Sequence, residues 1–145
     1  MKNKEKMMTR ILLVMVVAVM MLGTMGCSKK DDKIIGSAET VHEDGAVLGE
    51  GSRVFDFTVV HMNGDEVHLE IHTDKETVGE ALMDLGVIAG EEGEYGMYVK
   101  TVNGETVSYE EDGKYWAFYI NGEYGMSGVD TTTITEGDTY ALKVE

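Results

Sequence analysis

Residues 55–72 constrain the fold of this chain more than any other segment. They read FDFTVVHMNGDEVHLEIH, in which apolar and polar residues alternate on both sides of the Asn-Gly dipeptide at 63–64. Such alternation is typical of strands with one buried face, and the dipeptide between them predicts a β-hairpin. A one-residue slip would turn every side chain over, so the apolar side chains of both strands must share a face. The predicted pairs are Val59 with Leu69 and Phe57 with Ile71, around an Asn63-Gly64-Asp65 loop.

Further segments complete a domain that is predicted over residues 54–145. Residues 74–85 carry apolar side chains at helical spacing, with Asp74 as the expected N-cap and Gly86 as the stop. One helix against a mixed or antiparallel sheet is an α+β arrangement, and we expect a β-grasp-like fold with about five strands. The order is strand, strand, helix, and then three strands, the last three at 94–102, 115–120 and 137–144.

The N-terminus has the layout of an export signal. Four basic residues precede an unbroken apolar run at 11–21, which is too short for an ordinary membrane-spanning helix. Residues 1–26 are therefore predicted to be a signal peptide. The lone Cys27 resembles the first mature residue of bacterial lipoproteins, whose thiol carries lipid, including palmitate. The match departs from the usual pattern at Thr24, where an aliphatic residue is common. An uncleaved anchor with a free thiol is the alternative, and both place the domain at the cell surface, outside the cytoplasmic membrane.

The mature part is strongly acidic. The whole chain has 12 basic and 27 acidic residues, and residues 1–26 hold 4 of the basic and 1 of the acidic ones. Residues 27–145 therefore carry 8 basic and 26 acidic residues, a net charge of −18. Nucleic-acid binding depends on neutralising phosphates, so we expect none here. Residues 27–53 lack strand or helix periodicity and are rich in Gly, Ser and charge, which predicts a flexible acidic tether.

Histidines and nucleophiles predict neither a metal site nor a catalytic one. His68 and His72 lie four positions apart on one strand, roughly 13 Å, which is too far to share one ion. We expect both on a solvated face, and His61 at the edge of the core. Ser108 and Ser127 have no histidine with an orienting acid nearby in sequence, and no glycine-rich phosphate motif opens the helix. The chain is therefore not expected to be an enzyme.

The stretch YWAFYINGEYGMSGVD, residues 115–130, is the main candidate for a binding site. Both faces of residues 115–120 are apolar, so this strand is either covered on both sides or leaves one face open for a partner. Trp and Tyr suit binding surfaces because they combine a large apolar area with a polar tip. The glycine-rich loop at 122–128 permits close backbone approach, and a plain turn is the alternative.

The ordered motifs of residues 54–145 resemble the transcobalamin-like C-terminal domain family, which is found in bacterial exported lipoproteins. In the animal carriers this β-grasp-like domain closes over cobalamin held on a larger helical domain. No such helical domain accompanies it in this sequence, so half of the site would bind a corrinoid weakly unless another protein completes it. The motifs are TVGEAL on a helix, VNG after a strand, Tyr115-Trp116, Asn121-Gly122, Gly128-Val129 and Gly137-Asp138. The resemblance implies ligand contacts for Trp116, Tyr124, Gly125, Met126, Ser127 and Gly128.

Three functions follow as hypotheses. The first is a lipid-anchored binding domain that takes cobalamin, another corrinoid or another bulky small molecule and assists uptake, with a transporter subunit as a candidate partner. The second is an interaction or adhesion module that docks another exported protein. The third is a structural spacer in which the aromatic residues all belong to the core.

Overall fold

The computed structural model describes residues 33–145, and residues 32–145 form one compact unit. The predicted signal peptide and Cys27 lie outside the described residues. Across the described part of the chain, no helix has the length and apolar character that a bilayer crossing requires.

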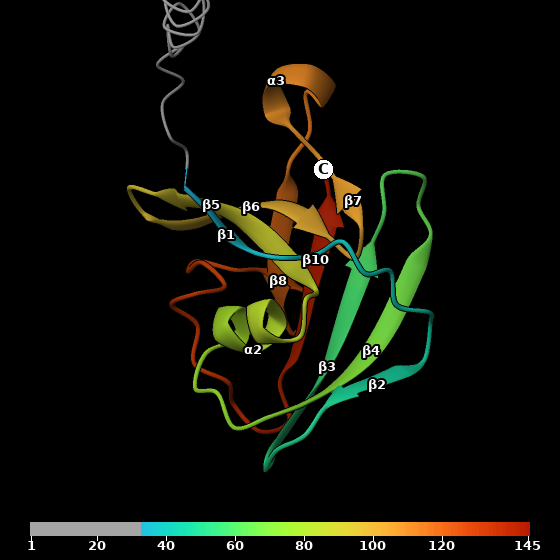
Figure 1. Ribbon diagram of the computed structural model, residues 1–145, viewed down its shortest axis with the longest axis vertical. Helices are drawn as coiled ribbons and strands as arrows, with labels where there is room; N and C mark the ends of the chain where they lie inside the picture. The colour runs from blue at the N-terminus through green and yellow to red at the C-terminus, as the bar shows by residue number, and fades with distance from the viewer. Residues whose placement is uncertain (1–32) are drawn as a thin grey trace, which may run out of the picture. The chain divides into compact units, whose positions relative to one another are not determined.

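The larger of two sheets has six strands in the order β2-β4-β3-β10-β8-β9 (Figure 1). Two of its pairings are parallel, β2 with β4 and β10 with β3, and the other three are antiparallel. The last strand of the chain therefore lies in the middle of this sheet. The strands are β2 (Ala46–Gly49), β3 (Arg53–Val60), β4 (Glu66–Thr73), β8 (Trp116–Ile120), β9 (Glu123–Tyr124) and β10 (Thr139–Val144).

The smaller sheet and one helix supply the other side of the core. The smaller sheet has the order β1-β5-β6-β7, with all pairings antiparallel. Helix α2 (Val78–Asp84) packs against β1 and β5, and its buried residues join both sheets in one hydrophobic cluster. A single-turn helix, α3 (Tyr109–Asp112), has no buried residue. The strands are β1 (Ile34–Gly36), β5 (Ile88–Gly93), β6 (Gly96–Val102) and β7 (Glu105–Thr106).

The predicted α+β class is confirmed, and all six predicted elements occur in the predicted order. The chain adds short elements that the sequence pattern did not show. Residues 88–93 form β5 although they carry only two apolar side chains before a Gly-Glu-Glu-Gly run, so they lack a readable alternation. The strands β1, β2, β7 and β9 have four residues or fewer, which is too short for any periodicity to be recognised.

The first hairpin is confirmed, but its predicted register is wrong by two residues. Val59 pairs with Val67 and Phe57 pairs with Leu69, so His68 opposes Thr58. A shift of two preserves the faces of both strands, and the alternation therefore could not distinguish the two registers. The turn closes one residue earlier than expected, with the Gly64 N–H donating to the His61 carbonyl at 2.9 Å.

Helix α2 begins later than predicted. Its N-cap is Thr77, which forms a capping box with Glu80 by accepting the Glu80 N–H at 3.2 Å. Asp74, the predicted N-cap, instead accepts hydrogen bonds from the backbone and hydroxyl of Ser52. The predicted stop is confirmed, because Gly86 has a φ of 69° and the Gly86 and Val87 N–H groups close the last turn.

Residues 33–52 are part of the folded domain, and the prediction of a free tether is wrong for them. The strand β1 pairs with β5, and β2 pairs with β4. Ala38 is buried at 2% exposure, and the Asn103 side chain holds the His42 backbone through two hydrogen bonds of 2.7 and 3.1 Å. The segment is ordered by these long-range contacts, which its own polar composition cannot reveal.

The Asn103 clamp should contribute measurably to stability. Asn103→Ala removes both hydrogen bonds to His42. It also places an alanine at a φ of 46°, a left-handed conformation that alanine disfavours. We therefore expect a loss of about 2–4 kcal/mol in the free energy of unfolding. Asn63→Ala is the matched control, since Asn63 bonds only to Asp65 within its exposed turn and should cost about 1 kcal/mol or less. Urea unfolding of the two variants checks this, and equal losses would contradict the clamp.

Two carboxylates that fasten residues 44–52 predict acid sensitivity. The His68 backbone N–H lowers the pKa of Asp44, and the Ser52 backbone N–H lowers the pKa of Asp74, both from an ordinary 3.8. Because both folded pKa values are depressed, their stabilisation is present above about pH 4 and is lost as the pH falls through the folded values. The urea concentration at the midpoint of unfolding should therefore fall less between pH 5 and pH 3 in the double variant Asp44→Asn/Asp74→Asn than in the native protein. An unchanged pH profile would refute the assignment.

The core and the exposed loops should respond differently to truncation. Trp116 is buried at 6% exposure, so Trp116→Ala should lower the free energy of unfolding by about 3–5 kcal/mol. Met126 is 98% exposed, and Met126→Ala should change it by about 0.5 kcal/mol or less. Thermal and urea unfolding measure both. A large loss for Met126→Ala would show that the loop is packed in solution.

Candidate functional site

The predicted loop residues lie on an exposed loop after β8. The Asn121-Gly122 turn, with φ values of 52° and 80°, leads into β9, which contains Tyr124. Tyr124 is 54% exposed and Met126 is almost completely exposed. The Ser127 hydroxyl is hydrogen-bonded to the Thr132 hydroxyl at 2.8 Å, so it is committed to holding the loop together. Tyr124 and Met126 are therefore the side chains of this loop that a ligand or partner could reach.

Two of the three glycines in residues 122–128, Gly125 and Gly128, are required by contacts within the protein itself. The Gly125 N–H donates to the Phe118 carbonyl at 2.8 Å, and a Cβ at Gly125 would lie 3.0 Å from the Phe118 ring. A Cβ at Gly128 would lie 2.9 Å from a carboxylate oxygen of Asp130. The sequence predicted a close backbone approach here, and the structure shows that the approached groups are Phe118 and Asp130.

Trp116 lies in the hydrophobic core and not on the loop surface. Its ring packs edge-to-face on His61, with the ring centroids 6.3 Å apart, and its indole N–H donates to the Lys100 carbonyl at 3.1 Å. His61 thus closes the edge of the core, as predicted. Residues 115–120 were predicted to be either covered on both sides or open on one face. The structure shows a buried inner face that carries Trp116 and Phe118.

A second copy of the loop sequence was missed. The pentapeptide Gly-Glu-Tyr-Gly-Met occurs at 93–97 as well as at 122–126, a repeat that is visible in the sequence. The first copy forms the tip of the β5–β6 hairpin, where Tyr95 is 92% exposed. The hairpin and the later loop meet at Asp130. We call residues 93–97 and 122–130 together the twin-loop surface.

Asp130 is the junction of the twin-loop surface. One oxygen accepts the Met97 N–H at 3.0 Å. The other is buried without a hydrogen-bond partner among the described residues, and a Cβ at either Gly96 or Gly128 would come within 2.9 Å of it. An unpaired buried acceptor costs about 1–3 kcal/mol, and such groups are rare in native proteins. The surrounding backbone must therefore hold this junction in place.

The base of the later loop is fixed to the start of α2. The Gly79 N–H donates to the Val129 carbonyl at 2.8 Å, and the Val78 N–H donates to the Thr132 carbonyl at 3.0 Å. A Cβ at Gly79 would lie 2.8 Å from the Asp130 Cα. The loop is thus anchored at its base while its tip, with Met126, is exposed.

A tyrosine cluster borders the loop on the outer face of β8. The rings of Tyr119 and Tyr124 meet edge-to-face at 5.7 Å, and Lys143 lies over Tyr119 at 4.6 Å. A hydrogen bond with Tyr124 raises the pKa of Tyr115, and a hydrogen bond with Glu145 raises the pKa of Tyr119. The hydroxyl groups of Tyr115 and Tyr119 are therefore both engaged in hydrogen bonds within the protein.

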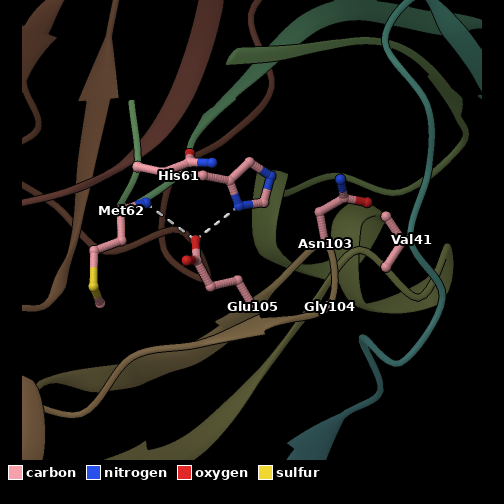
Figure 2. Close-up of a pocket in the computed structure, with 7 residues that line it drawn as sticks. Val41, His61, Met62, Asn103, Gly104 and Glu105 are labelled. Carbon is pink, nitrogen blue, oxygen red and sulfur yellow. Dashed lines mark hydrogen bonds and ion pairs between the residues drawn. The ribbon is translucent and has the colours of Figure 1, made fainter. Parts of the chain in front are cut away.

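A separate pocket of about 470 Å³ lies where the β3–β4 turn meets the β6–β7 turn (Figure 2). Glu105 bonds to the His61 ring at 2.7 Å and accepts the Met62 N–H at 3.2 Å. The Asn103 side-chain amide is hydrogen-bonded to the His42 backbone through both its oxygen and its nitrogen. The polar groups of this pocket thus bond mainly to the protein.

Potential metal ligands do not converge within residues 33–145. In this part of the chain no three His, Cys, Asp or Glu side chains are placed to hold one metal ion. His68 and His72 bond to separate carboxylates, Asp44 at 3.0 Å and Glu70 at 2.6 Å. The Ser127 hydroxyl faces Thr132 and not a histidine.

Comparisons with known proteins give one domain match and two similar structures. Residues 75–145 match the model of a family described as Domain of unknown function (DUF4430). No curated protein sequence matches the chain. A structure of a candidate metal binding protein from Ruminococcus gnavus is 30% identical with a TM-score of 0.61, covering 65% of this chain and 97% of that one.

Haptocorrin in complex with Cbi is similar at a TM-score of 0.53 and 15% identity. The similarity covers 68% of this chain and 26% of haptocorrin, and at this identity it shows a shared fold. The Ruminococcus gnavus protein is related more closely, over nearly its whole length. The chain therefore belongs to the same family as that protein.

Proposed function

We propose that this protein is a non-enzymatic binding domain that takes a bulky, largely apolar small molecule, a corrinoid being the leading candidate, on the twin-loop surface. The observation that carries the proposal is the hydrogen bond from the Met97 N–H to Asp130. It ties the first Gly-Glu-Tyr-Gly-Met segment to the loop that follows the second one. The two segments expose Tyr95, Tyr124 and Met126 on loops that are anchored at their bases. Exposed aromatic and methionine side chains on anchored loops suit recognition of a large apolar ligand.

The comparisons support a corrinoid as the first ligand to test. Haptocorrin, which shares the fold, was solved with Cbi, and the motif resemblance to transcobalamin-like domains points to the same class of ligand. The Ruminococcus gnavus protein is described as a candidate metal binding protein.

Location and partners form the second part of the proposal. We infer that Cys27 carries lipid and that the domain stands on the outer face of the cytoplasmic membrane, where it assists uptake. Since a single domain covers only one side of a large ligand, an uptake partner such as a transporter subunit would complete the site. The charge of −18 on residues 27–145 would keep such a domain soluble.

The second candidate function is a protein interaction module with no small-molecule ligand. The observation that favours it is the same exposure of Tyr95 and Met126, because aromatic residues and methionine are enriched at the centres of protein interfaces. Crosslinking on cells would then capture an exported partner, and Tyr95→Ala would abolish the capture without unfolding the domain.

Corrinoid binding can be tested by calorimetric titration of residues 32–145 with cobinamide and with cobalamin. We expect saturable binding, weakened about tenfold by Tyr95→Ala or Met126→Ala, since an anchoring contact contributes on the order of 1–2 kcal/mol. The matched controls are Tyr109→Ala and Met62→Ala, which remove an exposed Tyr on α3 and an exposed Met on the β3–β4 turn. The controls should bind as the native protein does. Absence of any heat at millimolar ligand would rule out direct binding.

A further inference from the structure

The outer face of the six-stranded sheet carries a groove that adjoins the twin-loop surface at Gly122. Both α2 and the smaller sheet pack on the inner face, in one cluster with its apolar side chains. The register places His68, Thr58, Ala141 and Tyr119 in one row across β4, β3, β10 and β8. Small side chains from the two central strands thus lie between a histidine and a tyrosine.

Two adjoining hollows follow this row. One, of about 240 Å³, is bordered by His68, Tyr119 and Lys143 and floored by Thr58 and Ala141. The other, of about 560 Å³, extends toward β2. They share Thr58, His68 and Thr139. We call the two hollows together the outer groove.

The charge on one side of the outer groove is unbalanced. Asp56 and Glu70 are directly opposite each other on β3 and β4, both exposed, and like charges in this position destabilise a sheet. Among the described residues, no Lys or Arg pairs with either of them, or with Glu66 in the same groove. The partners of Glu66 and Glu70 are His68 and His72.

Among the described residues that line the groove, Lys143 is the one fixed cation, and it is engaged with the Tyr119 ring at the groove's β8 border. Lys143 lies over the Tyr119 ring at 4.6 Å, on the β8 side, away from the β3–β4 pair. A partner that brought positive charges to Asp56 and Glu70 would relieve their repulsion. An extended chain would also fit a groove that runs over the small side chains of β3 and β10.

We propose that the outer groove docks an extended, lysine- or arginine-rich segment of a partner protein. Its cationic groups face Asp56, Glu70 and Glu66, and its backbone lies over Thr58 and Ala141 between His68 and Tyr119. The outer groove adjoins the twin-loop surface, because Gly122 lines it and its Tyr119 ring meets Tyr124. The carboxylates that carry this proposal lie on β3 and β4, so variants in them test it separately from the corrinoid proposal.

The test uses fluorescence anisotropy of a labelled ten-residue peptide of alternating Lys and Thr, with the full chain in mild detergent. We expect saturable binding that a Gln-Thr peptide lacks. Asp56→Asn/Glu70→Gln should weaken it roughly fivefold, as loss of two partly exposed charge contacts implies. The same variant should unfold at an equal or higher urea concentration, because it removes a like-charge pair.

The matched control is Glu110→Gln/Glu111→Gln, which makes the same change in net charge on the exposed residues of α3. The control should bind the peptide like the native protein. Equal weakening in both variants would overturn the proposal, because the peptide would then respond only to the overall charge of the chain. Unchanged peptide binding in Asp56→Asn/Glu70→Gln would overturn the proposal as well. So would binding of the small polyamine spermine without any binding of the peptide, because the groove would then take a small polycation and not an extended polypeptide.

Discussion

The parallel pairing of β10 with β3 is the contact on which the domain depends. It joins the first predicted hairpin to the last strand of the chain across more than half of the sequence. Tyr140 on β10 is the centre of this junction: its ring meets Phe55 edge-to-face at 5.3 Å and stacks with Phe118 at 6.1 Å. Its hydroxyl accepts the Thr135 N–H at 3.0 Å, so even the polar end of this buried side chain is satisfied.

This junction explains why exposed loops can be held in one arrangement. With β10 fixed between β3 and β8, the chain must leave the sheet after β9, at residue 125, and return to it at residue 139. The middle of this segment is fastened to α2 through Gly79 and to the β5–β6 hairpin through Asp130. Tyr95 and Met126 thus project from short, anchored segments, and pre-organised contacts of this kind lose less entropy on binding than a free loop would.

The sequence predicted the elements that have a readable period or a specific turn residue. The first hairpin, α2, its glycine stop and the Asn121-Gly122 turn are of this kind. The hairpin register was wrong by two residues because its buried face alternates with a period of two and fits both registers equally. The strands β1 and β2 were missed because their order comes from pairing with β5 and β4, and composition cannot show a distant partner.

The candidate site was predictable only in part. Exposure of Tyr124 and Met126 fits the predicted loop, whereas Trp116, predicted to contact ligand, is buried and bonded to Lys100. An alternating strand cannot tell which aromatic ring the rest of the fold will cover. The sequence analysis missed Tyr95, although the repeated pentapeptide was a usable signal. The role of Asp130 could not have been predicted from the sequence, because it depends on two glycines about 30 residues apart in the chain.

The most direct measurement of the central claim is the backbone amide NMR spectrum of residues 32–145 during titration with cobinamide. Binding on the twin-loop surface predicts that the amides of residues 93–97 and 122–130 shift together and saturate at one ligand concentration, while those of the β3–β4 turn stay in place. Shifts confined to the β3–β4 turn and Glu105, or no shift in either loop at saturating ligand, would contradict the account.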